Sequence, residues 1–249
     1  MIDSAPQPVA GAAVQLIVLD LMGTLVADDG LVEHAYTAAL REAGVEPGTP
    51  EEVTAQATIS AMAGRPTLDV LTAALTDPVR AEESTWAFDD AVLAKVPELR
   101  EFPGASDALD SLAAEGIVLA LTTSFSPEVR KAALAQTGWS DRFAMTLSAY
   151  GVRRGHPAPD LLLEAILELG IDSVSQVAIV GDNVADLEAG NRAGAGLVIG
   201  VRTGSTTADQ LAASPHTHLV DSIADVPTVV HTPRTSGQRR VSDERDPTF

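Results

Sequence analysis

An apolar run near the start of the chain leads directly into an aspartate and a glycine-containing loop. Residues 15–25 read QLIVLDLMGTL, which predicts a buried strand over residues 14–19 that carries Asp20 at its C-terminal end. In an open parallel sheet, ligands bind in the crevice beyond these strand ends. Gly23 lets the backbone approach a ligand and Thr24 offers a hydroxyl, so both are candidate substrate-binding residues. An ordinary Asp/Gly turn fits the same letters, and residues elsewhere in the chain have to decide between the two.

The composition is that of an acidic globular chain without cysteine. Of its 249 residues 45% are hydrophobic, and the formal net charge of −19 argues against nucleic acid or an anionic membrane as a partner. The lack of cysteine excludes disulfides and a cysteine nucleophile. No apolar run approaches the roughly 20 residues that span a bilayer, and residues 1–13 lack the pattern of a signal peptide. We therefore expect a cytoplasmic protein.

Helical patterns fill the stretch between the first strand and about residue 100. Apolar spacing, interrupted by proline and glycine, predicts helices over residues 31–44, 51–63, 67–76 and 79–95. We expect residues 31–100 to form a helical cap that is inserted into a core made of residues 14–30 and 101–228. Residues 1–13 are expected to be a flexible N-terminus, and the polar residues 229–249 a disordered tail.

Strands and helices alternate regularly in the second part of the chain. Further strands are predicted over residues 117–122, 144–147, 177–180, 197–201 and 218–220, and helices over residues 127–136, 159–169 and 185–193. Strands separated by helices of this length form βαβ units. The predicted fold class is therefore α/β, with a doubly wound, mostly parallel sheet and an inserted α-helical cap.

Several polar residues follow the predicted strands and should meet at one edge of the sheet. Asp20 and Asp182 could share a Mg²⁺ ion, with Asp186 as a further ligand or as a group that orients Asp182. The Thr123 hydroxyl, the Ser124 amide and a cation from residues 153–156 could then hold phosphate oxygens. This arrangement would let Asp20 attack phosphorus and form an aspartyl-phosphate.

Four motifs, in this order, resemble those of the haloacid dehalogenase-like (HAD) hydrolases. The family motif Asp-x-Asp-Gly-Thr resembles residues 20–24, its apolar run ending in Thr or Ser resembles residues 119–123, its Lys or Arg before Pro resembles residues 156–160, and its Gly-Asp-x-x-x-Asp resembles residues 181–186. The likeness covers roughly residues 14–225. It implies a Rossmann-like core and a mobile cap that closes over the substrate and excludes water.

The first motif departs from the family pattern at Met22. Family phosphatases place a second aspartate there as general acid and base, and methionine can do neither, although its backbone carbonyl could still bind Mg²⁺. Glu33 and His34 could supply the missing group, but a solvated helix face suits them better. An apolar residue at position 22 resembles the phosphonatase branch of the family, in which a cap lysine forms a Schiff base with phosphonoacetaldehyde. Thr67 stands where that lysine is expected, so the imine route is not expected here.

The third motif is also altered, because His156 stands in place of the Lys or Arg. A bound phosphate would favour its imidazolium form, and Arg153 or Arg154 could otherwise supply the charge. Arg65, in the predicted cap loop that family members use for substrate contact, is a further candidate. The candidate catalytic residues are thus Asp20, Thr123 and His156; the candidate substrate-binding residues are Gly23, Thr24, Arg65, Ser124 and Arg154; and the candidate metal ligands are Asp20, Met22, Asp182 and Asp186.

The resemblance implies a Mg²⁺-dependent hydrolase of a small phosphorylated or phosphonate metabolite. Two alternatives stay open: a 2-haloacid dehalogenase-like hydrolase in which Asp20 attacks carbon, and a non-catalytic homologue that binds a phosphorylated ligand or a protein. A homodimer formed through the cap, as in the phosphonatase branch, is an expectation from the resemblance alone.

Overall fold

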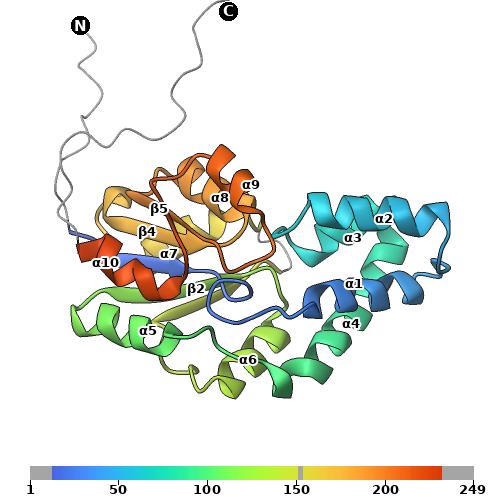
Figure 1. The fold of residues 1–249 in the computed structure, drawn as a ribbon, viewed down its shortest axis with the longest axis horizontal. Coiled ribbons are helices and arrows are strands. Elements are labelled where there is room, and N and C mark those ends of the chain that lie inside the picture. Colours follow the sequence, from blue (N-terminus) through green and yellow to red (C-terminus); the bar gives the residue numbers. More distant parts are fainter. Residues whose placement is uncertain (1–12, 151–153, 232–249) are drawn as a thin grey trace, which may run out of the picture.

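The computed structural model describes residues 13–150 and 154–231, and these form a six-stranded parallel sheet covered by helices (Figure 1). The strand order is β3-β2-β1-β4-β5-β6, and every neighbouring pair is parallel. The α/β Rossmann-like fold class is confirmed. The strands are β1 (Leu16–Leu19), β2 (Val118–Thr123), β3 (Met145–Ser148), β4 (Val177–Gly181), β5 (Leu197–Val201) and β6 (His218–Val220).

Both faces of the sheet are buried, as the continuous apolar letters of β1 predict. Side chains alternate along a strand, so Ile17 and Leu19 pack into one core cluster while Leu16 and Val18 pack into the other. The first face is covered by α5 (Ala105–Ala114), α6 (Pro127–Gln136) and α10 (Val226–His231), and the second by α7 (Asp160–Glu168), α8 (Val184–Ala193) and α9 (Ala208–Ala213). Three short 3-10 helices complete this part: η1 (Val96–Glu98), η2 (Val174–Gln176) and η3 (Ile223–Asp225).

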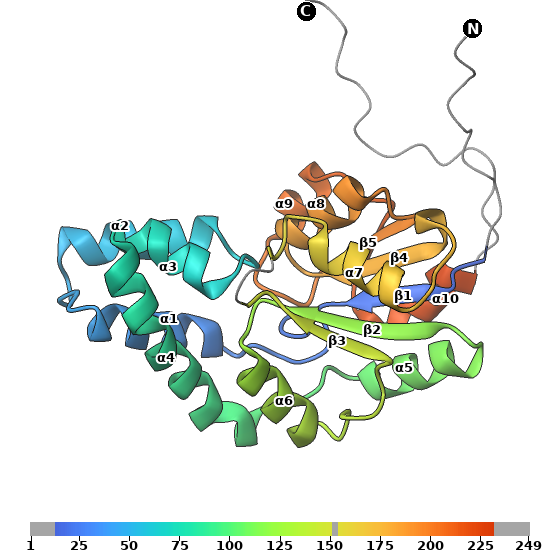
Figure 2. The same cartoon turned by 180° about the vertical axis from the view of Figure 1, so that it is seen from behind.

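Four helices between β1 and β2 form a separate block beside the sheet (Figures 1 and 2). They are α1 (Leu31–Glu42), α2 (Pro50–Ala61), α3 (Thr67–Leu75) and α4 (Pro78–Lys95). The chain leaves and re-enters the core through two paired segments, because Ala27 N–H donates to the Arg100 carbonyl at 2.9 Å and Phe102 N–H donates to the Leu25 carbonyl at 2.9 Å. The two chain segments that link the block to the core therefore run side by side.

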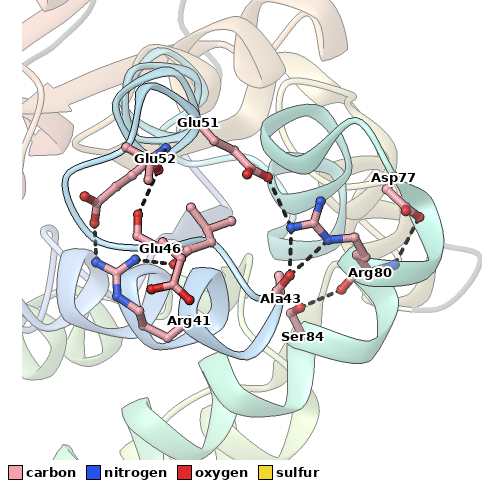
Figure 3. Close-up of polar contacts among 10 residues, drawn as sticks. Arg41, Ala43, Glu46, Glu51, Glu52, Asp77, Arg80 and Ser84 are labelled. Atoms are coloured by element: carbon pink, nitrogen blue, oxygen red, sulfur yellow. Dashed lines mark hydrogen bonds and ion pairs between the residues drawn. The ribbon is translucent and has the colours of Figure 1, made fainter.

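Two arginines hold the helices of this block together (Figure 3). Arg41, on α1, forms an ion pair with Glu52, on α2. Arg80, on α4, donates to the Ala43 carbonyl at 2.7 Å and to Glu51 at 3.1 Å. Since each guanidinium donates in a fixed planar geometry, these contacts tie α2 and α4 to the C-terminal end of α1.

The structure differs from the sequence expectations mainly near the C-terminal end. Residues 229–231 belong to α10, so the expected tail starts too early; Val229 and Val230 pack against the core and add apolar burial that stabilises the helix. The rest of that expected tail and residues 1–12 lie outside the described residues. Helix α9 was not expected, and β2 begins and ends one residue later than predicted. Within the described residues, no helix is both long and apolar enough to cross a membrane.

Candidate active site

Three carboxylates from two distant parts of the chain meet at the C-terminal edge of the sheet. One oxygen of each of Asp20, Asp182 and Asp186 lies within 4.8 Å of one oxygen of each of the others. They meet because β1 and β4 are neighbours in register, and Asp20 N–H donates to the Val180 carbonyl at 3.0 Å. The predicted convergence of Asp20 and Asp182 is therefore a feature of the structure.

Burial and mutual repulsion raise the pKa of two of these carboxyls. Removal from water, followed by the charges of Asp186 and Asp182, raises the pKa of Asp20 well above its ordinary value. Burial and the nearby Asp186 charge raise the pKa of Asp182 to about 8. A buried group of hard oxygen donors with this excess of negative charge suits a cation such as Mg²⁺, so the side chains present fit that ion.

Asp186 is held by contacts to both of its oxygens. Its Oδ2 accepts the Asn183 N–H at 3.0 Å, as part of the capping box of α8, and its Oδ1 lies 2.7 Å from Nδ1 of His156. At Gly181 a Cβ would come within 2.2 Å of Asp186 Oδ2, so only glycine fits beside it. Of the two roles considered for Asp186, these contacts favour the orienting one.

Asp182 is enclosed by neighbours that position its carboxylate. The Thr24 hydroxyl donates to Oδ1 at 3.1 Å, and the Asn183 side-chain amide donates to Oδ2 at 3.2 Å. Backbone passes so close that a Cβ at Gly23 or at Gly204 would lie 2.5 Å or 1.7 Å from Oδ2. Thr24 is fully buried, so its hydroxyl supports Asp182 instead of contacting a substrate as the sequence suggested.

The residues expected to supply the third-motif charge are not brought together. His156 is buried beside Asp186, and its Nε2 has no hydrogen-bond partner among the described residues. Arg154 forms an ion pair of 2.9 Å with Asp160 at the start of α7, its side chain is 74% exposed, and it does not line the cavity described below. Arg154 therefore lies outside the cavity in this structure, paired with Asp160, and its expected substrate contact stays a prediction. Arg153 lies outside the described residues.

A cavity of about 550 Å³ separates the carboxylate cluster from the helical block. From the core it is lined by Asp20, Met22, Gly23, Thr123, Ser124 and Asp182, among others. From the block it is lined by Glu33 and Arg65, and Arg65 is the one basic residue on its described walls. His34, Thr67, Lys95 and Lys131 do not line it, so no described lysine is available for an imine with a substrate.

The loop between α2 and α3 reaches across and touches the core. A Cβ at Gly64 would lie 2.8 Å from the Cβ of Asn183, and a Cβ at Gly155 would lie 2.6 Å from the ring of Pro66. Gly64 has a φ of 79°, a conformation that glycine adopts without strain. This contact places Arg65 next to the core residues that surround Asp182.

The cavity residues that the sequence did not predict include Asn183, Thr206 and Gln210. The Thr206 hydroxyl donates to the Asn183 side-chain oxygen at 3.2 Å, so the loop after β5 joins the site. The sequence predicts this position of the loop, because β5 is parallel to β1 and β4 and ends at the same edge of the sheet.

This fold and this carboxylate cluster agree with the family that the chain matches. A family model described as haloacid dehalogenase-like hydrolase matches residues 14–194, and the chain belongs to that family. It is a hydrolase of the HAD type, with relatives that are described as phosphatases.

Individual relatives cover most of the chain. The "Probable phosphatase IndB" of Dickeya dadantii is 33% identical over 223 residues, which are 87% of this chain and 93% of that protein. A phosphonoacetaldehyde hydrolase of Bacteroides fragilis is 27% identical over 58% of this chain and 57% of its own length. The crystal structure of a phosphonoacetaldehyde hydrolase-like protein from Oleispira antarctica superposes with a TM-score of 0.72 at 20% identity, over 92% of this chain and 95% of that one, which is a likeness of fold.

Proposed function

We propose that this chain is a Mg²⁺-dependent hydrolase that removes the phosphoryl group from a phosphorylated or phosphonate metabolite through an aspartyl-phosphate on Asp20. The observation that carries the proposal is the position of Asp20: it lines the cavity and also belongs to the carboxylate cluster with Asp182. A carboxylate that is both accessible to a substrate and adjacent to a cation site suits attack on phosphorus.

In the proposed first step, a carboxylate oxygen of Asp20 forms a bond to phosphorus while the bond from phosphorus to the leaving group breaks. Asp20 and Asp182 would hold Mg²⁺, whose charge would offset the repulsion between the carboxylate and the phosphate. Thr123 and Ser124 line the same cavity and would supply a hydroxyl and an amide for phosphate oxygens. The Thr123 oxygen accepts the Phe125 N–H at 3.3 Å, which leaves the hydroxyl proton free for donation to substrate.

The helical block acts in this proposal as a cap that shields the reaction from water. Its loop already contacts the core at Gly64 and Pro66, and the two linking segments next to Ala27 and Phe102 would absorb any opening motion. Arg65 then supplies the positive charge that pairs with the phosphate. His156 and Arg154 do not supply it, because neither of them lines the cavity.

Proton transfer falls to a group other than Met22. Two carboxyls at the start of the block, Asp28 and Glu33, line the same cavity. Burial raises the pKa of Asp28, the Val32 N–H that its carboxylate accepts opposes this rise, and the charges of Asp29 and Glu33 add smaller increases. The net rise in pKa is in the direction that suits a general acid. Asp28, or the substrate itself, would protonate the leaving group as its bond to phosphorus breaks. The Asp28 carboxylate formed in this way would then accept a proton from the water that attacks the aspartyl-phosphate and releases phosphate from Asp20.

Phosphate release from a panel of phosphate esters and phosphonates, measured with Mg²⁺ and with a chelator, tests the proposal. Asp20→Asn should abolish Mg²⁺-dependent release, whereas the matched change Asp29→Asn, at an exposed residue outside the cavity, should not. Turnover retained by Asp20→Asn would overturn the mechanism. Chloride release from a 2-haloacid in the presence of a chelator would favour the dehalogenase alternative instead.

A further inference from the structure

The cavity has an aromatic wall that runs from the phosphate end into the helical block. This wall consists of Tyr36 on α1, Phe88 on α4 and Phe125 in the loop after β2, and all three line the cavity. The ring centroids of Tyr36 and Phe88 are 4.7 Å apart, and those of Phe88 and Phe125 are 6.0 Å apart, so the rings are continuous. Since Phe125 directly follows Ser124, the wall begins beside the proposed phosphate site.

The part of the cavity beyond this point extends along α1. Val32, Tyr36 and Leu40 line it and are spaced by four residues, so they form one stripe of the helix. Eight residues of helix span about 12 Å. Ile59, on α2, lines the cavity as well and packs against the same core cluster as these residues. The space for a leaving group is therefore long, and this stripe gives it one apolar side, although Glu33 and Thr37 of the same helix also line the cavity.

Polar and apolar side chains occupy different depths of this space. Tyr36, Leu40, Phe88 and Phe125 are buried, whereas Glu33, Gln56 and Ser60, which also line the cavity, are exposed at its rim. Hydroxyl groups of a sugar would find few partners against this wall, and burying them unpaired is costly.

From this wall we propose, resting on the phosphoryl-transfer function above, that the substrate is a phosphate ester whose leaving group is extended and apolar, an arylalkyl or alkyl alcohol. The volume of about 550 Å³ lies within the range of roughly 300–1,000 Å³ that buries molecules of drug size, so a two-carbon leaving group leaves most of it unfilled. The chain thus differs in substrate class from relatives named for phosphonoacetaldehyde.

A homologous series of monoalkyl phosphates tests this directly, because leaving-group reactivity stays nearly constant while apolar length grows. We expect kcat/KM to rise roughly threefold per methylene from ethyl to hexyl phosphate, and 4-phenylbutyl phosphate to exceed ethyl phosphate by at least about a hundredfold. Glycerol 3-phosphate and phosphoglycolate should be the poorest substrates. A flat series, or phosphoglycolate as the best substrate, would overturn the inference while leaving the phosphatase function intact.

A matched pair of variants on α2 locates the effect. Ile59→Trp should fill the apolar space and lower the ratio of kcat/KM for 4-phenylbutyl phosphate to kcat/KM for ethyl phosphate at least tenfold. Val53→Trp should leave this ratio unchanged, because Val53 is 63% exposed and lies outside the cavity. Calorimetry with 4-phenylbutylphosphonate and the Asp20→Asn variant separates the two proposals. Binding without turnover of any ester by the natural protein would support the apolar site and refute the hydrolase; equal binding of ethylphosphonate would refute the apolar site.

Discussion

Thr24 and Asp182 lie 158 positions apart in the chain and are joined by a buried hydrogen bond of 3.1 Å. Because this hydroxyl is the donor to Oδ1, it holds the Asp182 carboxylate in the orientation that the proposed Mg²⁺ site requires. The loop after β1 thus positions the acidic residue after β4, as well as carrying Asp20 itself.

Replacing Thr24 by valine, which keeps the shape and removes the hydroxyl, should weaken Mg²⁺ binding about 10- to 100-fold. Thr24→Ser keeps the donor and should stay within a few-fold of the natural protein. Isothermal titration with Mg²⁺ measures both. Equal affinities of the valine and serine variants would show that the hydrogen bond does not orient a metal ligand.

The raised pKa of Asp182, about 8, predicts how stability and Mg²⁺ binding depend on pH. In the metal-free protein the Asp182 carboxyl binds its proton more tightly in the folded state than in the unfolded state. Its contribution to the free energy of unfolding is therefore complete below about pH 4 and is lost as pH rises through about 8. Mg²⁺ has to displace the same proton. The increase in Tm caused by Mg²⁺ should therefore grow from about pH 6 to about pH 8 and then level off. An increase that does not depend on pH, or one that persists in Asp182→Asn, would contradict the role of Asp182 as the titrating metal ligand.

Gly64→Ala should disturb the contact between the helical block and the core. Gly64 and Gly48 both have positive φ, 79° and 75°, so alanine costs about 1–2 kcal/mol of backbone strain at either place. Only the Cβ at position 64 meets another residue, Asn183, whereas nothing lies within 4 Å of a Cβ at position 48. Gly64→Ala should thus lower kcat/KM by tenfold or more relative to Gly48→Ala, with similar Tm values for both; equal kcat/KM would mean that this contact does not matter for turnover.

Arg65 and Arg154 offer a direct comparison of two guanidinium groups. Arg65 lines the cavity, and Arg154 is paired with Asp160 outside it. Loss of a charged contact to substrate costs about 1.5–3 kcal/mol, so Arg65→Ala should lower kcat/KM roughly 10- to 100-fold. Arg154→Ala should change it less than about twofold, since exposed ion pairs contribute little. The reverse ranking in steady-state kinetics would show that the third-motif loop supplies the charge.

The core could be predicted from the sequence because its signals are local and repeated. Apolar strands alternating with helices identify the parallel sheet, and an aspartate at the end of β1 and another after β4 must then meet at one edge. The loop after β5 begins at the same edge, so the position of Thr206 is predictable on the same ground, whereas its hydrogen bond to Asn183 is not.

Other parts depended on tertiary contacts that the sequence does not display. Thr24 looked like a substrate ligand, yet its hydroxyl is buried against Asp182. Arg154 looked like a phosphate ligand, yet Asp160 binds it. The aromatic wall joins Tyr36, Phe88 and Phe125 from segments far apart in the chain, and only the packing of the helical block on the core brings them together.

The most direct test of the central claim is to trap the covalent intermediate. The natural protein, mixed with Mg²⁺ and a turned-over phosphate ester and quenched rapidly in acid, should carry a phosphoryl group on the peptide that contains Asp20, detected by mass spectrometry. The same peptide should be unmodified when Mg²⁺ is replaced by a chelator. Full phosphate release on the timescale of the quench with Asp20 unmodified, or a phosphoryl group on a different residue, would contradict the account.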